Sequence, residues 1–246
     1  MSFLEEIEYP KNCLINSVIP KKDFYEAGFK NSDKNLFTNN VKQIKWVYSL
    51  KETNIQIPPY KDDEKEYLET EIFTLKLKKD NKIERVCELI HRFIPYPLLI
   101  VLYYKDKIML SVANKRDSKI DKDAIKLTDI RYTDWIDEEI PNKFAQELFD
   151  NLKFENLKKD DFFTLYNDIV SKIILYNGSR HAGKEVTKPV NEVKEINDKI
   201  YYLTKEINNK KYEIEDETQF NRQVELNKEI KGLKDQIKEL KEELVS

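Results

Sequence analysis

The sequence predicts an α+β fold, in which a mixed or antiparallel sheet with flanking helices is followed by a C-terminal antiparallel helical hairpin of coiled-coil type. Two observations lead to this prediction. Through the first 176 residues, segments that alternate apolar and polar side chains are interspersed with segments of helical period. From residue 191 onward, apolar residues recur at spacings of three and four, as in the narrow seam between two packed helices.

Helices and strands alternate in the first part of the chain. Pro20 suits the first turn of a helix, because its missing N–H group needs no partner there. Ile44, Trp46 and Tyr48 alternate with more polar neighbours, which is the pattern of a strand. The expected elements are a helix at 19–29, a helical piece at 33–37, strands at 41–50 and 71–78, and a helix at 83–93.

The second part of this region continues with strands and ends with helices. Segment 98–104 is apolar on both faces, which predicts a central place in the sheet. It pairs with 107–113 through a turn at Lys105 and Asp106. The remaining expected elements are a strand at 124–132, a helix at 141–152, and a helix at 161–175 capped by Asp160.

Three parts are therefore expected along the chain: an α+β body over 1–176, a linker over 177–190, and a helical hairpin over 191–246. The two apolar seams of the last part differ in heptad register by two residues, which a stutter or a stammer does not produce. A chain reversal near 215–218 explains the offset, and five apolar layers then match with a constant index sum of 433. A straight helix that dimerises is the alternative.

Composition limits the classes of function. The first 190 residues carry 32 basic and 32 acidic side chains, and the remainder has a net charge of −3, so no overall basic field attracts nucleic acid. Two distant cysteines indicate reduced thiols rather than a disulfide framework. The longest strongly apolar run, 97–104, is too short to cross a membrane. A cytoplasmic protein is expected.

Motifs for cofactors and metals are weak. Residues 178–185 follow the phosphate-binding loop pattern until Glu185, where the loop requires Ser or Thr, and a helix rather than a strand is expected before it. His91 and His181 are the only histidines, and no cysteine pair has ligand spacing, so no metal and no cofactor are predicted. His91 is interpreted as a structural hydrogen-bonding residue.

A divergent metal-dependent nuclease is the best hypothesis for an enzyme. Such enzymes combine metal-binding carboxylates with a lysine that stabilises the developing charge. Glu71 with Lys76 or Lys78 is the nearest candidate here. Both lysines lie at spacings that put them on the strand face opposite Glu71, so no catalytic residue is assigned.

Basic residues at the ends of strands are candidates for contact with nucleic-acid phosphates. They are Lys76, Lys78, Lys115 and Arg116. Isolated basic residues at strand ends are common in proteins of every class, so these four remain possible contacts rather than a motif.

Short segments in a fixed order carry a resemblance to a known family. The segments are Ile19–Tyr25, Leu36–Val41, Ile44–Leu50, Glu71–Lys76, Ile94–Pro97, Ala113–Arg116, Tyr132–Trp135 and Gln219–Asn227. Together they resemble an uncharacterised bacterial family, a domain of unknown function. Its members are typically encoded beside a helicase of the Swi/Snf or DEAD-like type and a DNA methyltransferase, in restriction-like or phage-defence clusters. Ser49–Thr53 departs from the Lys-Leu-Ser-Pro-type stretch that members often carry there.

The resemblance implies an accessory subunit of a DNA-acting defence complex, with the helicase or the methyltransferase as its partner. It supplies no catalytic residues. We expect a non-enzymatic adaptor whose hairpin contacts the partner through Gln219, Phe220, Asn221 and Arg222 at its tip. A nuclease acting in the same system and a homodimer formed through the hairpin are the alternatives.

Overall fold

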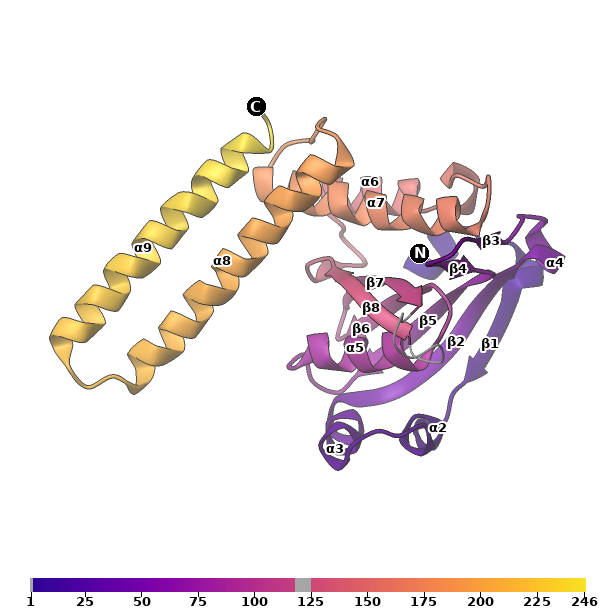
Figure 1. Cartoon of the computed structure of the whole chain (residues 1–246), viewed down its shortest axis with the longest axis horizontal. Coiled ribbons are helices and arrows are strands. Elements are labelled where there is room, and N and C mark those ends of the chain that lie inside the picture. Colours follow the sequence, from indigo (N-terminus) through magenta and orange to yellow (C-terminus); the bar gives the residue numbers. More distant parts are fainter. Residues whose placement is uncertain (1, 118–124) are drawn as a thin grey trace. The chain divides into compact units, whose positions relative to one another are not determined.

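The computed structural model describes residues 2–117 and 125–246, without the side chains of 116, 117, 125 and 126. The chain forms two compact units, Met1–Ile173 and Ile174–Ser246. The first unit has an α+β fold with a mixed sheet of seven strands and flanking helices, and the second is helical (Figure 1). The predicted fold class is therefore confirmed.

The large sheet has the strand order β1-β2-β5-β6-β7-β8, and β9 also pairs with β7. β5 and β6 are parallel neighbours, and every other pairing is antiparallel. Its strands are β1 (Leu14–Val18), β2 (Val41–Lys51), β5 (Glu69–Leu77), β6 (Leu98–Tyr104), β7 (Lys107–Asp117), β8 (Ile125–Tyr132) and β9 (Ile136–Asp137). A separate pair consists of β3 (Tyr60–Lys61) and β4 (Glu66–Tyr67).

The helices of the first unit connect and cover these strands. They are α1 (Phe3–Glu6), α2 (Lys21–Glu26), α3 (Asn31–Asn40), α4 (Glu52–Ile55), α5 (Ile83–Phe93), α6 (Lys143–Asn151) and the first part of α7 (Phe162–Ala182), with short 3-10 turns η1 (Lys11–Cys13) and η2 (Phe154–Asn156). α5 has the predicted bounds and connects the parallel strands β5 and β6, as a crossover between parallel neighbours requires.

Helices pack on both faces of the sheet. Alternate residues of β6, Leu98, Ile100 and Leu102, belong to the core cluster formed with α2, α3 and α5. The intervening Leu99 and Val101 are also buried, so β6 is covered on both faces as predicted for a central strand. In Figure 1, α2 and α3 lie below the sheet, and α6 and the first part of α7 lie above it.

Several elements differ from the sequence-based expectation. β1 was missed because all five of its residues are exposed at the edge of the sheet, so they carry no alternating pattern. Residue 124 of the expected strand 124–132 lies outside the described residues, and β8 begins at Ile125. The expected loop at 177–190 begins later, because α7 continues to Ala182.

The second unit contains the end of α7, then α8 (Val190–Asp216) and α9 (Phe220–Glu243), which pack side by side as a hairpin (Figure 1). The reversal spans 217–219, slightly later than expected. α9 follows Gln219, whose side chain makes no capping hydrogen bond. Glu217 organises the turn: its Oε1 accepts from the Gln219 N–H at 2.8 Å, and its carbonyl accepts from Gln223 Nε2 at 2.6 Å.

The later reversal changes which residues face one another across the hairpin. Lys210 of α8 pairs with Glu229 of α9, with Nζ and Oε2 2.5 Å apart, whereas the index sum of 433 would place Gln223 opposite Lys210. Val193 and Leu244 both lie within 4 Å of the position that a Cβ on Gly178 would take. The partners on α9 are therefore shifted by about one helical turn from the expected register.

In the part of the chain that the structure describes, no helix combines the length and the apolar character that crossing a bilayer requires.

Candidate functional site

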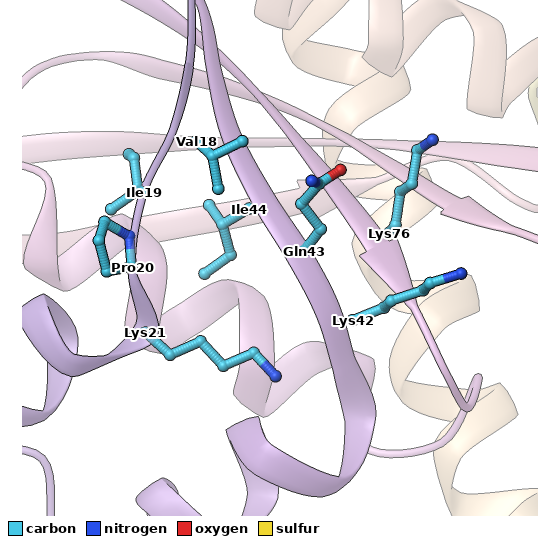
Figure 2. A pocket seen from close by; sticks show the side chains of 8 residues that line it. All are labelled: Val18, Ile19, Pro20, Lys21, Lys42, Gln43, Ile44 and Lys76. Carbon is cyan, nitrogen blue, oxygen red and sulfur yellow. The ribbon is translucent and has the colours of Figure 1, made fainter.

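A hollow of about 410 Å³ lies where β1 leads into α2, beside β2 and β5. We call it the lysine hollow, because three lysines from three different elements line it, namely Lys21, Lys42 and Lys76. Figure 2 shows their side chains together with the other lining residues, Val18, Ile19, Pro20, Gln43 and Ile44. No carboxylate is among the residues that line it.

A β-bulge places two of the lysines close together. The register of β2 against β5 shifts between Val41 and Gln43, so Lys42 is the extra residue of β2 at this point. Gln43 then pairs directly with Lys76 across the two strands. Directly opposed residues have Cβ atoms about 5 Å apart, so the side chains of Gln43 and Lys76 are neighbours and Lys42 adjoins them in the chain.

Lys21 is oriented from the opposite side of the hollow. Its connection is held against β2 because the Ile19 N–H donates to the Ile44 carbonyl at 3.0 Å. The ammonium of Lys21 donates to the carbonyl of Val41. Partial burial, and secondarily the charge of Lys78, lower the pKa of Lys21. The amine of Lys78 donates to the Thr38 carbonyl at 2.9 Å. Four lysines, Lys21, Lys42, Lys76 and Lys78, therefore lie around this end of β2 and β5.

Lys42 and Lys76 are exposed, and neither ammonium has a hydrogen bond or an ion pair with the residues that the structure describes. Lys76 and Lys78, two of the predicted nucleic-acid contacts, thus lie at one place together with Lys21 and Lys42. The latter two were missed, because only the pairing of β2 with β5 and the connection to α2 bring them there.

Lys115 lies elsewhere and is only 7% exposed. Its ammonium donates to the carbonyl of Ile94 at 2.5 Å and to that of Tyr96, just beyond the C-terminus of α5. Burial lowers the pKa of Lys115 to about 7, and the charge of Glu71 opposes that shift. These contacts argue against the predicted contact of Lys115 with phosphate. The side chain of Arg116 lies outside the described part of the chain.

The carboxyl group of Glu71 is a second polar group of interest in the first unit, and this residue is 2% exposed. Its carboxylate accepts from Ser49 Oγ at 2.9 Å and from Trp46 Nε1. Burial raises the pKa of Glu71 to about 7, although the two hydrogen bonds favour its charged form. Neighbouring Glu69 forms an ion pair with Lys51 at 2.9 Å.

Glu71 and the lysines considered with it in the nuclease hypothesis have different environments. Lys76, one of the two lysines considered with Glu71, lines the hollow and is exposed, whereas Glu71 is buried against Trp46 and Ser49. Within residues 2–117 and 125–246, no group of three or more His, Cys, Asp or Glu side chains is placed to hold a metal ion.

His91 has a structural environment, in agreement with its interpretation from the sequence. It is fully buried on α5, and its Nε2 forms a hydrogen bond with Ser111 Oγ of β7 at 3.0 Å. Burial, and secondarily the charge of Lys115, hold its pKa well below the usual value, so the ring is neutral at physiological pH.

The stretch 178–185 does not form a phosphate-binding loop. α7 runs through Ala182, so the strand that such a loop follows is absent here. Gly178 has a packing role instead: a Cβ at this position would lie 2.6 Å from Val193 Cγ1 of α8. A glycine therefore permits the close approach of α7 and α8.

The four predicted partner-binding residues lie at the turn of the hairpin. Phe220 is 75% exposed, and Gln219 and Asn221 beside it are also exposed. Arg222 turns back along α9, where its Nη1 lies 3.0 Å from Glu225 Oε2. The tip also presents exposed residues that the prediction did not include, and these are Tyr212, Glu213, Glu215 and Asp216.

The family model described as Domain of unknown function (DUF4391) matches residues 7–237. No curated protein and no solved structure matches the chain.

Proposed function

We propose, from the premise that the chain belongs to the family described as Domain of unknown function (DUF4391), that this protein is a non-enzymatic adaptor whose hairpin tip binds a partner protein. The observation that carries the proposal is the exposure of Phe220, 75%, at the turn of a hairpin of two long helices. An aromatic side chain at such a position costs free energy in water and contributes strongly when a partner buries it.

The length of the hairpin suits an arm. α8 has 27 residues, which corresponds to about 40 Å at the usual rise of an α-helix. Its seam is narrow, and the outward faces of both helices are largely charged. The hairpin thus presents little apolar surface along its sides and an aromatic group at its end.

The chemistry of the tip indicates the kind of surface that it fits. Glu213, Glu215 and Asp216 surround the turn and are exposed, so the tip is acidic as well as aromatic. A complementary partner surface has an apolar pocket for Phe220 with basic residues at its rim. Proteins that act on DNA carry basic surfaces, which agrees with a partner of that class.

The partner that we propose is the helicase or the DNA methyltransferase of a restriction-like or phage-defence system, as the family resemblance implies. The protein would then be an accessory subunit of a DNA-acting complex. A cytoplasmic location goes with this proposal, because both cysteines, Cys13 and Cys87, are free and buried, as in a reducing compartment.

The test is direct binding of the full chain to the purified helicase and the purified methyltransferase of the proposed system. Phe220→Ala is expected to weaken the complex by about 30-fold or more, the usual effect of removing a central aromatic contact. Tyr202→Ala is the matched control, because Tyr202 is 68% exposed on α8 but lies away from the turn. Titration calorimetry measures both. An equal affinity of the two variants, or no binding to either subunit, contradicts the adaptor proposal.

The two alternatives are tested with the same preparations. Cleavage of DNA in the presence of Mg²⁺ or Mn²⁺ that disappears in Glu71→Ala would favour a nuclease. Light scattering distinguishes a homodimer: a dimer in the wild type that becomes a monomer in Phe220→Ala would assign the hairpin tip to self-association.

A further inference from the structure

We propose that the lysine hollow binds phosphate groups of a nucleic-acid backbone, with Lys42 and Lys76 as direct contacts and with Lys21 and Lys78 contributing charge beside them. This inference goes beyond the adaptor function, and it does not depend on it, because the hollow belongs to the first unit and the tip to the second.

The concentration of positive charge is the first argument. The first 190 residues have as many acidic as basic side chains, so this group of four ammonium groups is a local excess rather than part of a basic protein. The residues that line the hollow include three lysines and no acid. The charge of Lys78 already contributes to the lowered pKa of Lys21, and a bound anion offsets such repulsion between like charges.

The state of each ammonium group is the second argument. Lys42 and Lys76 have no partner among the described residues, so their donors are open to a ligand. Lys21 and Lys78 each donate to one main-chain carbonyl, which fixes the position of the amine. An ammonium group has three donors, so two remain on each of these lysines. The site therefore combines two amines held by main-chain carbonyls, those of Lys21 and Lys78, with two amines that no described residue engages, those of Lys42 and Lys76.

The shape of the site favours a polymer over a small phosphate compound. Sites for small molecules bury most of their ligand and position it with a few enclosed polar groups. Here Lys42 and Lys76 are exposed, and the donors are spread over α2, β2 and β5. A backbone with regularly spaced phosphates can contact several such groups at once, and each contact releases counterions.

The lining also indicates that the site does not read base sequence. Its uncharged side chains are aliphatic, apart from the amide of Gln43, and no aromatic residue lines it. Recognition of single bases by stacking needs an aromatic or guanidinium plane, which the lining lacks. Binding through phosphates alone is independent of sequence and depends strongly on salt.

The experiment measures binding of the full chain to a fluorescein-labelled 20-base-pair duplex by anisotropy, over a series of salt concentrations. The double variant Lys42→Gln/Lys76→Gln is expected to weaken binding about tenfold or more at low salt. It is also expected to reduce the slope of log K against log salt by about 2, because each lost phosphate contact contributes about 0.9. Two duplexes of unrelated sequence should give the same values.

The matched control is Lys143→Gln/Lys158→Gln, which removes two exposed lysines from the same unit at positions outside the hollow. Its affinity and salt slope should equal those of the wild type. All four lysines are exposed, so thermal unfolding should show that both double variants fold. Equal losses in the two double variants, or no duplex binding by the wild type at low salt, overturn the proposal.

Inorganic phosphate distinguishes a polymer site from a site for a small anion. If calorimetry shows that phosphate alone binds the wild type at micromolar concentration and that Lys42→Gln/Lys76→Gln abolishes this binding, the hollow is a small-anion site and the nucleic-acid assignment is wrong. Undiminished binding of the partner proteins by the same variant would show that the adaptor function stands apart from the hollow.

Discussion

The two units of this protein place their charged groups in opposite ways. The sheet unit buries Glu71 and Lys115 within a broad core, where hydroxyl, indole and carbonyl groups are their hydrogen-bond partners. The hairpin buries mainly one apolar seam and keeps its charges outside it, and the partly buried Lys210 pairs with the exposed Glu229 across the two helices. Changes in pH should therefore alter the stability of the sheet unit, whereas changes in side-chain volume should alter the stability of the hairpin unit.

The same contrast separates the two proposed binding regions. The lysine hollow depends on three elements that the sheet brings together, so it is fixed by tertiary structure. The hairpin tip is a local feature, built by consecutive residues around Glu217. Two interactions of different chemistry are thus available, a basic one on the sheet unit and an acidic, aromatic one on the hairpin.

The largest expected effect is a pH dependence of the sheet unit. Burial raises the pKa of Glu71 to about 7, above its value in the unfolded chain, so the folded state binds more protons between about pH 4.5 and 7. The free energy of unfolding should therefore fall by about 3 kcal/mol as the pH rises through this window, since one pKa unit corresponds to about 1.4 kcal/mol. Glu71→Gln should remove that fall.

Denaturant unfolding followed by tryptophan fluorescence measures it, because both tryptophans, Trp46 and Trp135, belong to the sheet unit. Gln is a suitable substitute: its oxygen can accept from Trp46 Nε1, and its amide can donate to Ser49 Oγ. If the free energy of unfolding depends on pH in the same way in the wild type and in Glu71→Gln, the buried carboxyl group of Glu71 does not cause the expected pH dependence of the sheet unit.

A smaller effect is expected from adding one methyl group to the hairpin unit. The Cβ of Gly178→Ala would lie 2.6 Å from Val193 Cγ1, so α7 and α8 must separate or distort. Overpacking of this kind costs about 1–3 kcal/mol. In Gly178→Ala, the helical signal in circular dichroism should be lost at a lower denaturant concentration than in the wild type. The unfolding midpoint measured by tryptophan fluorescence should not change.

Gly232→Ala is the control, because nothing lies within 4 Å of its Cβ position on α9. It should stabilise the hairpin by about 1 kcal/mol, the difference in helix propensity between the two residues. If Gly178→Ala shifts the tryptophan transition as much as the helical one, the two units unfold together and the comparison fails.

The smallest effect concerns the charged surface of the hairpin. Lys210→Gln removes the ion pair with Glu229 between α8 and α9. Exposed pairs contribute little and are screened by salt. The unfolding midpoint of the helical signal should be slightly lower than that of the wild type at low ionic strength. The two midpoints should coincide at about 1 M salt, where the Debye length is about 3 Å. A shift that persists in high salt would mean that the aliphatic part of Lys210 packs in the seam.

Local patterns were sufficient for much of the fold. Helix α5 and strand β6 have the predicted bounds, because the sequence of α5 encodes a single apolar face and that of β6 an unbroken apolar run. Elements without such a pattern were missed, of which the exposed edge strand β1 is the example. The hairpin was predicted from its seams, but the predicted register was wrong, because a reversal centred one or two residues later moves every facing pair by about one turn.

The candidate sites divide along the same line. The tip residues Gln219, Phe220, Asn221 and Arg222 are consecutive, so the sequence alone located them at the end of the hairpin. Lys76 and Lys78 were marked as basic, but Lys21 and Lys42 join them only through the bulge in β2 and the connection to α2. Lys115 is also a lysine, but it is buried, and its ammonium group donates hydrogen bonds to main-chain carbonyls just beyond α5.

The sequence by itself determined the α+β class, the order of the longer helices and strands and the presence of two long amphipathic helices, because periodicity and turn chemistry act over a few residues. Tertiary structure alone decided which lysines meet, which carboxylate is buried and which glycine permits close packing. These outcomes depend on pairing between segments far apart in the chain, and a strand bulge or a turn that differs by one residue changes which side chains become neighbours.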